Sequence, residues 1–281
     1  MSATLLASRG IASCRVSCGS LSERPDQVCN TISQTRRSSH VARTLPGYSA
    51  ARRRAGELYE WNTLEDVSAG LPHIAVGKVP SDGHHAPAAL LALGGVERLV
   101  SAGTPLVEEG ALAVVWACTS ASFIGGLDWA REQSATLASR LGVPVTSTAL
   151  ALHDALDALG HRRVDLLSPY PDDVTLRLVS FLREGGVSVV NDRALDCPYA
   201  TDSHRVDIRA EVRCFCARYP GDSRPLLVPD TAVNSLFLRE ALSREVGREV
   251  LTANQVTLWA GLKRSGAASL PEGLLGPLAA V

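Results

Sequence analysis

The regular part of the chain alternates short, continuous apolar runs with longer amphipathic stretches. Residues 111–117 are apolar throughout, which is typical of a strand buried on both faces of a sheet. Residues 127–141 have helical spacing, and Gly142 follows as a stop signal. Further strands are predicted at 143–146, 163–167, 187–190, 225–228 and 249–251, and further helices at 148–159, 172–184, 207–218, 232–246 and 254–264.

Strands that alternate with helices predict an α/β protein whose parallel sheet carries helices on both faces. A faint repeat pairs residues 114–119 and 142–147 with residues 226–231 and 247–252. The repeat gives Cys118 and Asp230 equivalent places, each before a threonine and each where a strand meets a loop. We therefore expect two pseudo-symmetric lobes, each a mainly parallel sheet flanked by helices, with both residues in one cleft beyond the strand ends.

Composition and charge narrow the class of protein. The chain is 46% hydrophobic and 20% charged, as expected for a globular protein. It has no run of 18 apolar residues, which argues against a membrane-spanning helix. Residues 1–54 carry a charge of +7 and the remainder −8, and an acidic body argues against nucleic acid as the main partner. We predict neither a nucleic-acid nor a membrane partner.

The first 54 residues are rich in Ser and Arg and show no sustained hydrophobic period. Three interpretations compete for them: an organelle-targeting segment, a basic tail, or a disordered extension or misplaced start. The third is favoured, because this composition buries little. We accordingly divide the chain into an N-terminal extension, 1–54, and a two-lobed α/β domain, 55–281.

Seven cysteines, an odd number without the layout of a disulfide-rich domain, indicate a reducing compartment, and we predict a cytoplasmic protein. Cys214 and Cys216 lack the spacing of a zinc or redox pair, and no second pair completes a ligand set. No metal site is predicted.

Four stretches together resemble one known family: residues 116–120 with 123–126, 142–147, 167–170 and 252–259. The Ala-Cys-Thr-Ser and Asn-Gln-x-Thr-Leu-Trp pieces resemble the Asp/Glu racemase superfamily, specifically its maleate isomerase and arylmalonate decarboxylase branch. The likeness covers roughly residues 72–266. It implies two related lobes and no cofactor. It also implies an active site between the lobes, with cysteines at one or both strand ends and with backbone amides and hydroxyls that bind a carboxylate.

The chain departs from the family pattern in two places. Asp230-Thr231 stands where the family usually has a second Cys-Thr. The first strand of the N-terminal lobe should precede Pro72, and the nearest candidate is the weakly patterned stretch 55–60.

Cys118 is the leading candidate for chemistry, as a nucleophile or as an acid/base. A thiolate reacts, and a nearby helix N-terminus lowers a thiol pKa, whereas the alternative is a buried cysteine that only fills space. Thr119 and Ser120, with the backbone N–H groups that follow, suit an anion pocket. The alternative for these two residues is an ordinary helix N-cap.

Asp230 is the second candidate, either as a helix cap or as an acid/base that faces Cys118. A carboxylate and a thiolate that lie close together repel, so one of them tends to hold a proton. Thr231 and the amide of Ala232 would extend the anion pocket. Tyr170 follows a predicted strand, and the family likeness favours a role in the site for it over that of a plain turn tyrosine.

These residues indicate a cofactor-independent isomerase or racemase of a small mono- or dicarboxylate, similar to a maleate isomerase. An arylmalonate decarboxylase-like lyase is the enzymatic alternative. A non-catalytic carboxylate-binding protein is an alternative of another class. The expected partner is a small carboxylate, and a homo-oligomer is left open as the assembly.

Overall fold

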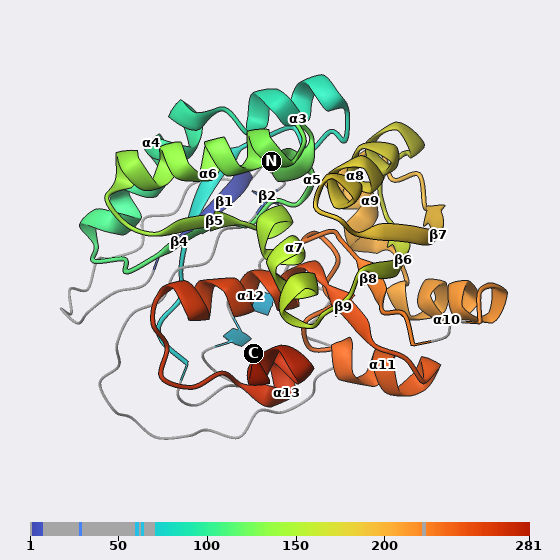
Figure 1. The fold of residues 1–281 in the computed structure, drawn as a ribbon. Coiled ribbons are helices and arrows are strands. Elements are labelled where there is room, and N and C mark those ends of the chain that lie inside the picture. Colours follow the sequence, from blue (N-terminus) through green and yellow to red (C-terminus); the bar gives the residue numbers. More distant parts are fainter. Residues whose placement is uncertain (1, 8–27, 30–59, 62, 65–70, 221–222) are drawn as a thin grey trace, which may run out of the picture.

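The chain folds around two separate β-sheets (Figure 1). The computed structural model describes residues 2–7, 28–29, 60–61, 63–64, 71–220 and 223–281. Within these residues, one sheet is built by strands up to Ser147 and the other by strands from Arg163 onward. The mixed α/β class with parallel strands is as predicted.

The first sheet is centred on β1 (Ser2–Ala7) and β4 (Val114–Trp116). β1 runs antiparallel to β4 and to β3 (Ala75–Pro80), and parallel to the short β2 (Val28–Cys29). β4 runs parallel to β5 (Val145–Ser147). This sheet is therefore mixed rather than mainly parallel, because β1 runs against two of its neighbours.

The second sheet is parallel throughout, in the order β7-β6-β8-β9. Its strands are β7 (Ser188–Ala194), β6 (Arg163–Ser168), β8 (Leu226–Val228) and β9 (Val250–Thr252). Every residue of β8 and β9 is buried, as the continuous apolar runs predicted. The carboxyl ends of these strands carry the residues singled out in the sequence.

Helices cover both sheets. α4 and α6 pack together against the first sheet, and α12 contacts α7, β4 and β5 as well as β9 of the second sheet (Figure 1). The helices are α3 (Pro87–Leu93), α4 (Val96–Glu108), α5 (Ser120–Phe123), α6 (Leu127–Leu141), α7 (Thr148–Ala158), α8 (Asp172–Glu184), α9 (Ala200–Arg205), α10 (Ile208–Arg218), α11 (Arg239–Val246), α12 (Ala253–Arg264) and α13 (Glu272–Leu275), with a 3-10 helix η1 (Gly276–Ala280).

Two edge strands pass directly into helices that their own last residues cap. Ser147 Oγ accepts a hydrogen bond from the Leu150 N–H in the first turn of α7, over 3.3 Å. Thr252 and Gln255 form a reciprocal capping box at the start of α12. Because both caps are local in sequence, these two β-to-α junctions are fixed by neighbouring residues.

Several predicted elements are confirmed. The helices at 127–141 and 172–184 have the predicted bounds. Gly142 and Gly247 adopt left-handed backbone angles, with φ of 72° and 66°, and end α6 and α11 as predicted. Only glycine adopts such angles without a steric penalty from a side chain.

One predicted helix is wrong over its first seven residues. The pattern predicted a helix at 232–246, but α11 begins only at Arg239, and the residues from Thr231 to Leu238 form turns. The Asp230 carboxylate accepts a hydrogen bond from the Ala232 N–H, which favours a turn at this point instead of a helix.

The N-terminal extension is only partly described. Ser2–Ala7 and Val28–Cys29 are strands, and β1 lies in the first sheet beside β4. The rest of residues 1–54 lies outside the described residues, so the predicted boundary at residue 54 stays a prediction. The candidate first strand at 55–60 is not seen as such, since Glu60 is helical and residues 55–59 are not described.

Candidate active site

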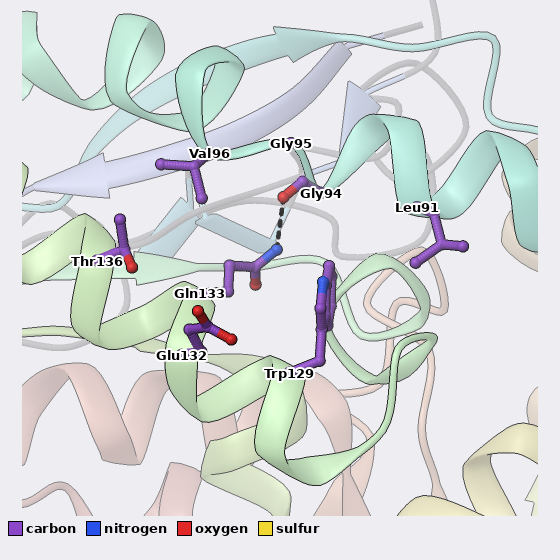
Figure 2. A pocket seen from close by; sticks show the side chains of 8 residues that line it. All are labelled: Leu91, Gly94, Gly95, Val96, Trp129, Glu132, Gln133 and Thr136. Carbon is purple, nitrogen blue, oxygen red and sulfur yellow. Dashed lines mark hydrogen bonds between the residues drawn. The ribbon is translucent and has the colours of Figure 1, made fainter.

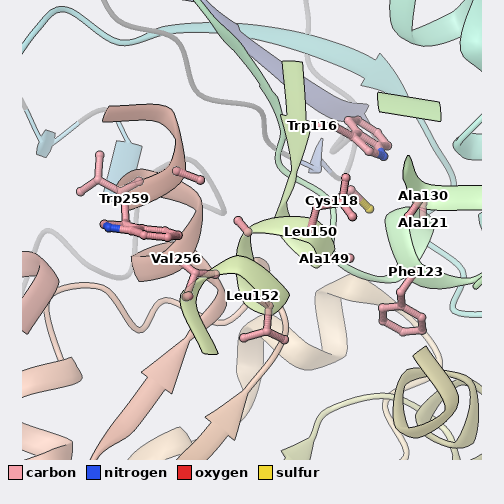
Figure 3. Packing of buried hydrophobic residues seen from close by; sticks show 14 of the residues in the cluster. Trp116, Cys118, Ala121, Phe123, Ala130, Ala149, Leu150, Leu152, Val256 and Trp259 are labelled. Carbon is pink, nitrogen blue, oxygen red and sulfur yellow. The ribbon is translucent and has the colours of Figure 1, made fainter. Parts of the chain in front are cut away.

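Cys118 follows β4 by two residues and precedes α5. It is 4% exposed and belongs to the large cluster of buried hydrophobic residues that includes Trp116 and Phe123 (Figure 3). Its Sγ atom lies 3.9 Å from the Ser120 hydroxyl oxygen, within reach of a weak hydrogen bond. Burial agrees with a packing role, and the hydroxyl contact is the polar feature that a reactive thiol would use.

Thr119 and Ser120 are both buried next to the thiol. Thr119 does not cap α5, because its side chain makes no capping hydrogen bond. The Thr119 hydroxyl finds no hydrogen-bond partner among the described residues, although it is buried. A buried hydroxyl left in this state is costly, and a bound polar group would satisfy it. The capping interpretation of Thr119 is therefore wrong.

Asp230 follows β8 and Pro229 and is 4% exposed. One carboxylate oxygen accepts a hydrogen bond from the Ala232 N–H at 3.0 Å, and the other is buried and has no hydrogen-bond partner among the described residues. Since α11 begins nine residues later, Asp230 stabilises a turn and is not a helix cap. Its second oxygen remains available for chemistry.

A hydrogen bond joins the ends of β4 and β8. The Thr231 hydroxyl donates to the Ala117 carbonyl oxygen over 3.4 Å. Ala117 directly precedes Cys118 and Thr231 directly follows Asp230, so the two predicted site residues come from adjoining strand ends. The structure thus brings together two segments that lie more than 100 residues apart.

Tyr170 lies just beyond β6 and is fully buried. Its hydroxyl donates to the Pro229 carbonyl oxygen at 3.1 Å, one residue before Asp230. Its ring packs edge-on against His85, with centroids 4.9 Å apart, and against Phe123. Tyr170 therefore ties the end of β6 to the residue that precedes Asp230 at the end of β8.

The sequence pattern did not single out two nearby residues, Cys197 and His85. Cys197 is 6% exposed, and burial raises the pKa of its thiol to about 11, to which the negative charge of Asp230 contributes. The buried His85 holds the Cys197 carbonyl oxygen through a 2.8 Å contact from Nδ1. Both residues lie in loops, and no sequence motif surrounds them. Nothing in the sequence pattern therefore marked them as candidates.

A second polar network lies behind Thr231. The Asn254 side-chain amide nitrogen lies within hydrogen-bond distance of the Thr231 and Val233 carbonyl oxygens and 2.7 Å from Glu60 Oε2. Glu60 is 1% exposed, and its other oxygen accepts from the Leu236 N–H. Burial raises the pKa of Glu60 to about 7, although these hydrogen bonds oppose the shift.

Two surface pockets lie apart from these residues. One of about 420 Å³ opens between the start of α4 and α6, where Gln133 donates to the Gly94 carbonyl oxygen at 2.6 Å (Figure 2). Another of about 540 Å³ lies beside α8 and the turn before α6. Neither is lined by a predicted site residue.

Within the part of the chain that the structure describes, no three His, Cys, Asp or Glu side chains gather as a metal site would require. No single helix of these residues is long and apolar enough to cross a membrane. The bent pair α3 and α4 passes the same test of length and hydropathy only when joined across a 42° bend.

Comparison with known proteins identifies relatives of this chain. Arylmalonate decarboxylase of Bordetella bronchiseptica is 27% identical over 202 residues, which cover 70% of this chain and 81% of the relative. Maleate isomerase of Pseudomonas putida is 29% identical over 162 residues, which cover 53% of this chain and 62% of that enzyme. Both relatives are enzymes.

A solved structure agrees with the sequence relatives. A liganded double mutant of arylmalonate decarboxylase, with one glycine changed to cysteine and one cysteine to serine, superimposes with a TM-score of 0.63 at 27% identity. The match covers 70% of this chain and 83% of the solved one. The resemblance to the maleate isomerase and arylmalonate decarboxylase branch is thus confirmed. Since the family model for arylmalonate decarboxylase matches residues 93–275, well over half of the chain, the protein belongs to that family.

Proposed function

We propose that this chain is a cofactor-independent isomerase or racemase of a small mono- or dicarboxylic acid, with Cys118 and Asp230 as its reacting groups. The observation that carries the proposal is the hydrogen bond from the Thr231 hydroxyl to the Ala117 carbonyl oxygen. It supports a shared site, because it links the residue before the thiol to the residue after the carboxylate.

The uncommitted polar groups support a carboxylate as the ligand. The Thr119 hydroxyl is buried and has no partner among the described residues, and the Ser120 hydroxyl lies beside the thiol. Preorganised donors such as these stabilise negative charge where it develops during reaction. The Thr231 hydroxyl and the Ala232 N–H, also predicted to bind the ligand, already donate to the Ala117 carbonyl oxygen and to Asp230, so each would have to exchange that bond for one to the ligand.

In the isomerase form, the Cys118 thiolate adds to one carbon of an activated double bond and the electron pair moves onto the adjacent carboxylate. Rotation about the resulting single bond follows. The carbon–sulfur bond then breaks, the double bond re-forms in the other geometry, and the thiolate is regenerated.

In the racemase form, the two groups work on opposite faces of an acidic carbon. Asp230 removes the proton, the electron pair is held on the carboxylate, and the Cys118 thiol returns a proton from the other face. A thiol and a carboxylate suit this exchange because only one of the two needs to be charged at a time.

Decarboxylation is the second candidate, and the match to the arylmalonate decarboxylase family favours it. In that reaction the pocket holds one carboxylate, the other leaves as carbon dioxide, and Cys118 or Asp230 protonates the carbanion that remains. The same residues and the same pocket serve both reactions, so the choice depends on the substrate.

We further propose that the two sheets are related lobes. In each, a buried strand ends two residues before the candidate residue, and an edge strand passes into a helix capped by the strand's last residue, Ser147 in one and Thr252 in the other. The Thr148 hydroxyl at the start of α7 lies 2.8 Å from the Thr257 hydroxyl, one turn into α12, so the two helices pack against each other. The matching strand-to-helix junctions support an internal repeat.

The test is proton NMR of the full chain in heavy water with maleate, aspartate, hydantoin and arylmalonate as separate substrates. We expect isomerisation, loss of an α-proton signal or loss of carbon dioxide with at least one of them. Cys118→Ala should lower that rate by about 10³-fold or more and leave the fold intact, because the reacting sulfur is gone. Cys214→Ala is the matched control, since Cys214 is exposed on α10.

Asp230→Asn should lower kcat far more than it changes KM, because the amide keeps the turn but cannot carry a proton. Full turnover in Cys118→Ala would rule out the thiol mechanism. Thermal stabilisation by these acids without any exchange or conversion would instead identify a carboxylate-binding protein.

A further inference from the structure

The segment from Thr231 to Leu238 follows Asp230 directly and has no regular structure of its own. Its backbone is held from outside. The Asn254 amide nitrogen lies 3.2 Å from the Thr231 carbonyl oxygen and 3.1 Å from that of Val233. The Leu236 N–H donates to Glu60 Oε1 at 2.8 Å. His204 Nδ1 also lies 3.3 Å from the Ala232 carbonyl oxygen. This segment, here called the 231–238 turn, is therefore held by three side chains that are remote in sequence, of which Glu60 and His204 are titratable.

Glu60 is the centre of these contacts. Its second oxygen accepts from the Asn254 amide at 2.7 Å. One Glu60 oxygen therefore contacts the 231–238 turn directly, and the other orients the Asn254 amide, which contacts the same turn. The Glu60 side chain is almost completely buried. Every partner is a neutral N–H donor, and an ionised carboxylate can accept from all of them at once.

We propose that Glu60 is a positioning residue that holds the 231–238 turn, and with it Asp230 and Thr231, in the reactive arrangement, and that it does so only as a carboxylate. The inference rests on the proposed function of Asp230. It assigns a task to a buried acid that takes no part in the bond-making steps.

Protonation weakens the arrangement for a simple reason. A protonated carboxyl group turns one oxygen into an O–H donor, which then faces an N–H donor, so one of the two links is lost. Burial raises the pKa of Glu60 to about 7, against the hydrogen bonds from Asn254 and from the Leu236, Phe237 and Ser235 N–H groups. The groups that face it are thus the Asn254 amide from α12 and backbone amides of the turn, and no charged side chain of the described residues contributes to the shift.

Hydrogen–deuterium exchange of the full chain at pH 6 and pH 8, normalised to intrinsic amide rates, tests the inference without a substrate. Openings that leave Glu60 buried break only its hydrogen bonds to the turn, and these bonds are weaker when Glu60 is protonated. In the wild type, we therefore expect the amides of the 231–238 turn to exchange roughly five- to tenfold faster at pH 6, the loss expected for one hydrogen bond. Glu60→Gln should remove this pH dependence. Glu184→Gln is the control, because Glu184 also accepts a backbone N–H, that of Leu127, at the start of α6.

Asn254→Ala provides a second variant if Glu60→Gln does not fold. It leaves Glu60 to titrate but removes the amide link, and should raise exchange of the turn at pH 8 towards the pH 6 level. A turn whose exchange is the same at both pH values in the wild type, or still changes with pH in Glu60→Gln, would overturn the inference.

Turnover supplies the second measurement. With whichever acid reacts, kcat of the wild type should fall severalfold between pH 8 and pH 6 with little change in KM. Glu60→Gln should have a lower kcat than the wild type at pH 8, and its kcat should fall by a smaller factor over this range. If hydrogen exchange follows the expected pattern but no acid is turned over, only the proposed function is contradicted. Turnover combined with pH-independent exchange would contradict only the role of Glu60.

Discussion

At the scale of single residues, the candidate site combines side chains whose polar atoms are buried but lack some of their hydrogen-bond partners. The Thr119 hydroxyl and one Asp230 oxygen have no hydrogen-bond partner among the described residues. Leaving such atoms buried costs free energy of folding, about 1–3 kcal/mol each, unless a ligand satisfies them. Proteins often retain such groups where they act, and these two atoms lie at the adjoining ends of β4 and β8.

Burial of Glu60 also costs free energy of folding, by an amount that depends on pH. Its pKa is about 7 in the folded chain and about 4.5 without burial. Between these values the folded chain keeps a proton that the unfolded chain releases, so its contribution to stability falls as pH rises from 4.5 to 7 and is then constant. The loss is about 3 kcal/mol.

Glu60→Gln should remove this decline. The free energy of unfolding of the variant, minus that of the wild type, should therefore rise by about 3 kcal/mol between pH 4.5 and pH 7. Urea unfolding at half-unit pH steps measures the difference, in which the constant effect of the substitution cancels. A difference that stays level across the window would show that Glu60 titrates normally in the folded chain.

At the scale of elements, β6 depends on a buried ion pair. Asp165 is fully buried within the strand, accepts from Arg248 at 2.8 Å and from Arg224 at 3.3 Å, and bonds Asn191 of β7. Removing one partner of such a group leaves a buried charge uncompensated. The network thus ties the strand that precedes Tyr170 to its neighbours.

Asp165→Ala should accordingly destabilise the chain by roughly 3–5 kcal/mol, because Arg248 is left buried and unpaired. Glu97→Ala is the comparison, since the Glu97–Arg140 pair is exposed and should change the unfolding free energy little. Thermal unfolding of both variants measures the contrast. Equal shifts for the two would mean that burial of the Asp165 pair has no energetic consequence.

The elements that the sequence predicted well are those fixed by nearby residues. The bounds of α6 and α8 follow from apolar spacing and glycine stops, which are local signals. The helix predicted from residue 232 failed because Asp230 holds the Ala232 N–H in a turn and because Asn254 and Glu60 hold the residues that follow. No local pattern reveals the contacts of Asn254 and Glu60. Mixed strand direction in the first sheet likewise depends on β1, from a segment without a sustained period.

The same distinction applies to the site. Cys118 and Asp230 could be found because each ends a buried apolar run, and the hydrogen bond from Thr231 to Ala117 places those ends side by side. Cys197, His85 and Glu60 could not be proposed from the sequence, because they are placed near these residues by contacts between segments far apart in the chain. Their roles, and those of the predicted site residues, stay predictions until the variants are measured.

At the scale of the whole molecule, the two sheets meet where β4 and β8 end. Thr231→Val keeps the shape of the side chain but removes the donor to the Ala117 carbonyl oxygen. We expect a loss of about 1 kcal/mol, or about 2 °C in Tm, together with a lower kcat because the thiol and the carboxylate lose their common anchor.

Thr104→Val is the matched control, since the Thr104 hydroxyl donates to the Val100 carbonyl oxygen on the exposed side of α4. It should change Tm little and leave kcat untouched. Should both valine variants behave alike in activity, the contact between the sheets would have no part in the reaction.

The graded exposure of the cysteines has a practical consequence. Cys214 is exposed, Cys216 is intermediate, and Cys118 and Cys197 are buried. Among these four cysteines, a small alkylating reagent should therefore consume Cys214 first and Cys118 slowly, at a rate set by how often the strand ends open. The rate of labelling therefore reports whether a ligand is bound. An acid that binds beside Cys118 should slow the late phase of labelling and leave the early phase unchanged, whether or not its product is known.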